Sequence, residues 1–90
     1  MMQFNCKIMD ELGIHARPAG LFAKACKELG DTVVTITKGD KTVKASQLMK
    51  LMGLGVKNGD EITVAVEGGD EAAALEIVKK FLQENLAAQL

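Results

Sequence analysis

The fold is decided by a stretch in the middle of the chain, which reads Thr32-Val33-Val34-Thr35-Ile36-Thr37-Lys38-Gly39-Asp40-Lys41-Thr42-Val43-Lys44. Its first part is rich in β-branched residues, which favour an extended strand over residues 32–37. The Gly39-Asp40 pair and its flanking lysines predict a tight turn, and a short strand follows over 42–44. The stretch therefore predicts a β-hairpin.

The segments on either side of the hairpin predict two more strands and three helices. Apolar residues alternate over 4–8 and 62–66, which is the period of a strand with one buried face. Apolar residues recur at helical spacing over 16–29, from Ser46 or Gln47 to 53, and from Asp70 to 86. We expect Gly30 to end the first helix, Ser46 to cap the second, Asp70 to cap the third and the tail after Leu86 to fray.

These elements predict an α+β fold in one domain, residues 1–90. The order is strand, helix, strand, strand, helix, strand, helix (βαββαβα). A four-stranded sheet with all three helices on one face would bury every apolar stripe together, as a two-layer sandwich. The hydrophobic pattern alone does not determine the order of the strands.

Composition excludes several classes of function. The 90 residues carry a net charge of −1 and 3% aromatic residues, so the chain lacks the basic field and stacking platforms of nucleic-acid binders. Apolar runs are far too short to cross a membrane, and we expect a cytoplasmic protein that does not insert into one. Cys6 and Cys26 have no metal or redox spacing and are interpreted as free thiols in the core. No metal and no cofactor are predicted.

His15 is the only histidine of the chain and the strongest candidate for chemistry. Pro18 belongs in the first turn of a helix, which places His15 at or near the helix cap, where histidine is a poor choice for stability. The positive helix end favours the neutral, nucleophilic ring. A phosphoryl group on His15 would meet the backbone N–H groups of Ala16 and Arg17 and the Arg17 guanidinium. The alternative is a capping loop histidine beside a solvated arginine.

Three segments resemble the HPr family, the histidine-containing phosphocarriers of the bacterial sugar phosphotransferase system. They are Gly13-Ile14-His15-Ala16-Arg17-Pro18-Ala19-Gly20, Leu48-Met49-Lys50-Leu51-Met52-Gly53-Leu54-Gly55 and Gly59-Asp60-Glu61-Ile62-Thr63-Val64. The resemblance implies an open-faced antiparallel sheet with strand order 1-4-2-3. It also implies that enzyme I phosphorylates His15 at Nδ1, and that the group then passes to the A domain of a sugar permease.

Two helix faces are candidates for partner docking. Arg17, Gly20, Lys24 and Lys27 lie on one side of the first predicted helix, away from its apolar stripe. The second helix has more apolar residues than one buried stripe needs, and we assign Leu51 to the core. The resemblance implies a contact patch at Leu48, Met49 and Met52. An apolar patch beside basic residues suits transient docking of acidic partners.

One position departs from the resemblance. Many members have a Lys-Ser pair before the aliphatic pair of the second helix, and that serine is a regulatory phosphorylation site. Here the pair is Ser46-Gln47, so phosphorylation of Ser46 is not expected.

Two alternatives to a sugar phosphocarrier remain. The chain could be a paralogue that serves a nitrogen-related or regulatory phosphorelay, or a small binding domain that is never phosphorylated. A self-contained enzyme is disfavoured because no second acid, base or metal cluster accompanies His15. We expect a monomer.

Overall fold

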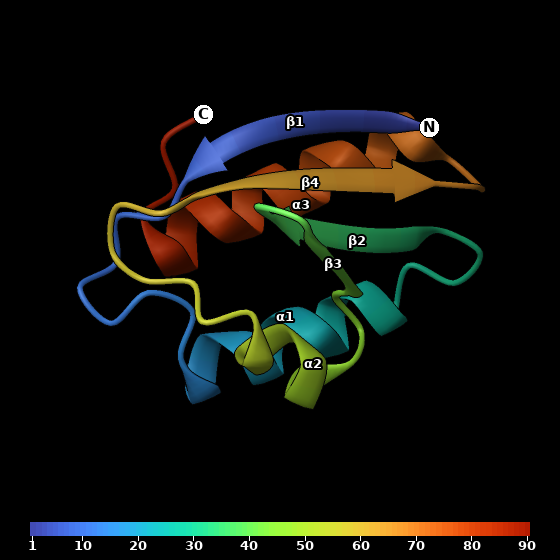
Figure 1. The fold of residues 1–90 in the computed structure, drawn as a ribbon. Helices are drawn as coiled ribbons and strands as arrows, with labels where there is room; N and C mark the ends of the chain where they lie inside the picture. The colour runs from blue at the N-terminus through green and yellow to red at the C-terminus, as the bar shows by residue number, and fades with distance from the viewer.

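A four-stranded antiparallel sheet and three helices make up the computed structural model, which describes residues 1–90 (Figure 1). The elements are β1 (Met2–Lys7), α1 (Ala16–Lys27), β2 (Val33–Lys38), β3 (Lys41–Lys44), α2 (Leu48–Gly53), β4 (Glu61–Glu67) and α3 (Glu71–Leu86). The strand order is β1-β4-β2-β3, as the resemblance implied. The predicted α+β sandwich and the hairpin formed by β2 and β3 are confirmed.

The sheet is buried on one face and open on the other. Val64 of β4 lies opposite Phe4 of β1 and Ile36 of β2, and this row faces the helices. On the open face, the Thr63 hydroxyl donates to the Asn5 carboxamide oxygen at 2.7 Å. Figure 1 shows α1, α2 and α3 on the same side of the sheet. The alternation of apolar and polar residues thus sets which face the helices cover.

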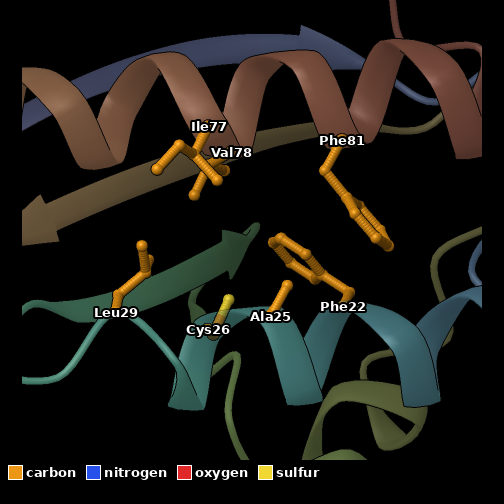
Figure 2. A pocket seen from close by; sticks show the side chains of 7 residues that line it. All are labelled: Phe22, Ala25, Cys26, Leu29, Ile77, Val78 and Phe81. Atoms are coloured by element: carbon orange, nitrogen blue, oxygen red, sulfur yellow. The ribbon is translucent and has the colours of Figure 1, made fainter.

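The core continues between α1 and α3. The rings of Phe22 and Phe81 stack with their centroids 5.2 Å apart. Figure 2 shows these rings beside Cys26 and Val78, around an apolar cavity of about 10 Å³. A space of this size barely holds one water and has no polar lining, so it is a packing gap and not a ligand site.

The first helix is shorter than the sequence predicted. It ends at Lys27, and Leu29 lies in the turn that follows. Gly30 has the left-handed φ of 67° that was expected of it, but it lies within this turn, two residues beyond the C-cap Glu28, and does not itself cap the helix. The apolar spacing extends to Leu29 because Leu29 still packs against the core, although its backbone has left the helix.

The expected caps are correct for one helix and wrong for another. Asp70 caps α3, and its carboxylate accepts a hydrogen bond from the Ala73 N–H at 3.1 Å. Ser46 does not cap α2, because the N-cap position is Gln47, whose side chain makes no capping bond. Ser46 lies in the turn between β3 and α2. Residue type alone therefore put this helix start one residue too early.

The expectation that the tail after Leu86 frays is also wrong. Leu86 is fully buried and Ala88 is buried. Gln89 then pairs with Lys7 of β1 through two backbone hydrogen bonds of 2.9 Å. Buried apolar contacts and a β-bridge to the edge strand therefore hold the tail.

Both cysteines are buried free thiols, as predicted. Burial raises the pKa of Cys6 to about 11, with a contribution from the charge of Glu61, and it raises the pKa of Cys26 to about 12. The ordinary value is 9.0. Above pH 9 the thiols therefore ionise first in the unfolded chain, which then binds fewer protons than the folded protein.

The free energy of unfolding should consequently be independent of these thiols below about pH 9 and should fall as the pH rises from about 9 to 12. Urea denaturation across this range would measure the fall, and Cys26→Ala should lessen it. At pH 8, Ellman's reagent should modify the folded protein far more slowly than the urea-unfolded chain. Equal rates in the two states would contradict the burial of the thiols.

Candidate functional site

The backbone at the start of α1 leaves two N–H donors free beside His15. His15 is the N-cap residue, with φ −111° and ψ 177°, and its side chain makes no capping hydrogen bond. Its carbonyl oxygen accepts from the Ala19 N–H at 3.0 Å, whereas the N–H groups of Ala16 and Arg17 donate to no backbone acceptor. The first turn contains no acidic residue. Together with the helix dipole, these donors favour an anion next to the His15 ring.

Gly13 fixes where the histidine lies. Its φ of 65° is left-handed, and its Cα packs so closely on the loop before β4 that a Cβ would strike the Val56 carbonyl oxygen and lie 2.6 Å from the Lys57 Cα. The next residue, Ile14, is buried and donates its N–H to the same Val56 oxygen at 3.0 Å. The segment before α1 is therefore attached to the far loop, which positions His15 just beyond the attachment.

Asp10 is a neighbour of the His15 ring that the sequence analysis did not single out. Its Oδ1 lies 3.6 Å from His15 Nε2, and the two side chains are 27% and 35% exposed. The same Oδ1 accepts a hydrogen bond from the Leu12 N–H at 2.9 Å. The turn over residues 10–13 thus folds a carboxylate back toward the ring.

His15 and Arg17 share one shallow hollow of about 320 Å³. The hollow is lined by Asp10, His15, Arg17, Pro18, Leu21, Glu84 and Asn85. Arg17 is exposed and forms no salt bridge or side-chain hydrogen bond, so its guanidinium is available to an incoming anion. The sequence predicted the pairing of His15 with Arg17 but not the contribution of Glu84 and Asn85 from the end of α3.

The predicted docking residues lie on adjoining surfaces of α1 and α2. Leu48, Met49 and Met52 are 37%, 81% and 38% exposed, whereas Leu51 is fully buried, as predicted for a core residue. Lys27 of α1 lies with Leu48 and Met49 around a second hollow of about 540 Å³. The structure therefore joins the basic side of α1 and the apolar side of α2 into one surface. We call Leu48, Met49 and Met52 the apolar patch.

The basic residues predicted beside this patch also lie at the surface. Lys24 and Lys27 are exposed and Gly20 is half-buried on α1. The half-buried Ser46 lines the same second hollow as Lys27. The expectation that Ser46 is not phosphorylated stays a prediction.

The site is suited to one kind of chemistry. An imidazole with a free ring nitrogen can accept a group covalently, and the two free N–H groups with Arg17 would stabilise negative charge on that group. The structure contains no group of three or more His, Cys, Asp or Glu side chains placed to hold a metal ion. None of its helices is both long and apolar enough to cross a membrane.

Comparison with known proteins gives consistent matches along the whole chain. Residues 2–84 match the family profile PTS-HPr, described as the PTS HPr component phosphorylation site. The phosphocarrier protein HPr of Mycoplasma genitalium is 32% identical over 85 residues, which cover 94% of this chain and 97% of that protein. A solved histidine-containing phosphocarrier protein from Mycoplasma superposes with a TM-score of 0.91 at 29% identity, covering 99% of this chain and 100% of that one.

A third relative is the HPr-like protein Crh of Bacillus subtilis, which is 35% identical over 96% of this chain and 100% of its own length. The crystal structure of Crh superposes with a TM-score of 0.73 at 36% identity, covering 93% of this chain and 95% of that chain, and is described as a dimer with a swapped domain.

Proposed function

The chain is a member of the HPr family of phosphocarriers, and we propose that it accepts a phosphoryl group from phospho-enzyme I on His15 and passes it to the A domains of sugar permeases. The observation that carries this proposal is the position of His15 at the start of α1, beside two N–H groups without a backbone acceptor and in one hollow with Arg17. Such a site favours a covalently held anion over a neutral ligand.

In the proposed transfer, the lone pair of His15 Nδ1 attacks the phosphorus atom, and the bond between phosphorus and the donor atom of enzyme I breaks. The bonding electrons return to that donor atom. The N–H groups of Ala16 and Arg17 and the Arg17 guanidinium hold the phosphoryl oxygens after transfer. In the second transfer, a nucleophile of the receiver attacks the phosphorus atom, and the bond to His15 Nδ1 breaks. The protein therefore acts as a carrier and not as a catalyst. We place this role in the cytoplasm.

Incubation with phosphoenolpyruvate and enzyme I tests this function. The protein should gain the mass of one phosphoryl group, and acid should remove it, because phosphohistidine is acid-labile. Receiver domains added singly then separate the sugar pathway from a nitrogen-related or regulatory relay. Transfer to sugar permease A domains supports the proposal, and transfer only to other receivers supports the paralogue.

The docking surface follows from the same proposal. The apolar patch lies beside Lys27 and Lys50, and α2 contains no acidic residue. Flexible methionines can adapt to several partners, and the lysines would attract acidic surfaces. We infer that enzyme I and the receivers dock in turn on this surface.

Met49→Glu should weaken binding of enzyme I roughly tenfold, because docking would desolvate a carboxylate and bring it against an acidic partner. Met49 is 81% exposed, so the melting temperature should change little. Isothermal titration calorimetry with enzyme I would measure the affinity. Ala72→Glu is the control, since Ala72 is exposed on α3 outside the patch and the substitution adds the same charge. Equal loss of affinity in both variants would argue against the patch.

A further inference from the structure

The two nitrogens of the His15 ring have different surroundings. Nε2 lies 3.6 Å from Asp10 Oδ1, while the free N–H groups of Ala16 and Arg17 lie at the start of the helix that His15 caps. A neutral imidazole carries one proton, and the partner of one nitrogen decides which nitrogen holds it. A carboxylate accepts hydrogen bonds only, so it favours the proton on the nitrogen that faces it.

We propose that Asp10 is a positioning residue for phosphoryl transfer, which keeps the proton of His15 on Nε2 and leaves the Nδ1 lone pair free as the nucleophile. This inference rests on the proposed function, because it concerns how the same histidine is presented to its donor. Asp10 touches neither the phosphoryl group nor a partner in this role and acts through the imidazole.

Asp10 is held firmly enough for such a role. Its N–H donates to the Leu86 carbonyl at 3.1 Å, and its own carbonyl accepts from the Gly13 N–H at 2.9 Å and from the Asn58 side chain at 3.3 Å. Its Oδ1 accepts from the Leu12 N–H at 2.9 Å, which restricts the side chain as well. Two segments distant in sequence, at Asn58 and Leu86, together with the adjoining turn over residues 10–13 therefore hold Asp10 beside the ring.

The charge of Asp10 also suits the transfer step. When Nδ1 forms its bond to phosphorus and the donor bond breaks, the proton stays on Nε2 and the His15 ring becomes positively charged. Asp10 then faces this positive charge from the Nε2 side, away from the phosphoryl oxygens. The carboxylate therefore stabilises the charge that develops on the ring, with modest strength because the pair is partly exposed.

The test uses the full chain and two substitutions of Asp10, one that removes the whole side chain beyond Cβ and one that removes only its charge. Nitrogen-15 NMR of His15 in alkaline buffer, where imidazole is neutral, gives the share of each tautomer. Asp10→Ala should shift the population toward the Nδ1-protonated form and slow phosphoryl acceptance roughly fivefold. Asp10→Asn keeps the size of the side chain but loses its charge, so it should shift the population in the same direction and also slow acceptance. Glu11→Gln removes a neighbouring exposed charge and should change neither quantity.

An unchanged tautomer population in folded Asp10→Ala would overturn the proposal, and so would a shifted population with an unchanged rate. A wild-type protein that takes up no phosphoryl group would refute the proposed function instead, and the tautomer shift would still decide whether Asp10 controls the ring. Should Asp10→Ala fold poorly by circular dichroism, Asp10→Asn decides, since it preserves the turn: an acceptance rate equal to wild type would overturn the proposal.

Discussion

The His15→Ala variant should take up no phosphoryl group from phospho-enzyme I, while its melting temperature stays close to that of the wild type. Alanine removes the only imidazole of the chain, so no other histidine can take over the group. The imidazole makes no capping hydrogen bond and is about one-third exposed, which limits the stability lost to about 0.5 kcal/mol. Intact-mass spectrometry after incubation with phosphoenolpyruvate and enzyme I would measure uptake.

The control for this experiment is an acid treatment of both proteins. The wild type should lose its added mass in acid, and the variant should have none to lose. An acid-labile gain of one phosphoryl group in folded His15→Ala would show that another side chain is the acceptor. In that case the proposed function would fail at its central residue.

Gly13→Ala should lower the free energy of unfolding by about 3 kcal/mol, from left-handed backbone strain and overpacking together. The new Cβ would strike the Val56 carbonyl oxygen and crowd the Lys57 Cα, and both are backbone atoms that cannot rotate away. Urea denaturation would measure the loss. Phosphoryl acceptance should also fall in the folded fraction, because relief of the clash moves the segment that positions His15.

Gly30→Ala is the matched control for this substitution. Gly30 has a φ of 67°, almost equal to the 65° of Gly13, but nothing lies within 4 Å of its would-be Cβ. Gly30→Ala should therefore lower the free energy of unfolding only through left-handed backbone strain, by about 1 to 2 kcal/mol. Equal losses at the two glycines would mean that the close approach of Gly13 to the far loop contributes nothing.

The sequence predicted most of the fold because the strands carry a clear period of two and the hairpin has a typical turn. It also predicted the position of His15, since Pro18 can only be accommodated in a first helical turn without loss of a hydrogen bond. The strand order came from the family resemblance, because alternation says which face is buried but not which strands are neighbours. The start of α2 was misplaced because a serine in a preceding turn resembles a serine at a cap.

The surroundings of His15 were less predictable. Glu84 and Asn85 lie beside His15 only because α3 ends near the start of α1. A local sequence pattern does not predict which distant segments come into contact. Asp10 is close in sequence, but its approach depends on the left-handed turn at Gly13. The firmly held tail was missed for a similar reason, since the β-bridge to Lys7 joins opposite ends of the sequence.

This bridge changes how the edge of the sheet meets other molecules. β1 is an outer strand, and an outer strand offers unpaired N–H and C=O groups on which a foreign strand can add. At Lys7, the last residue of the strand, the N–H and C=O groups are already hydrogen-bonded to Gln89 of the same chain. A copy of β1 could be exchanged between two molecules only after the pairing of Lys7 with Gln89 is broken. The last residues thus block the addition of a foreign strand at the Lys7 end of this edge, where Gln89 already uses the backbone groups that such a strand would need.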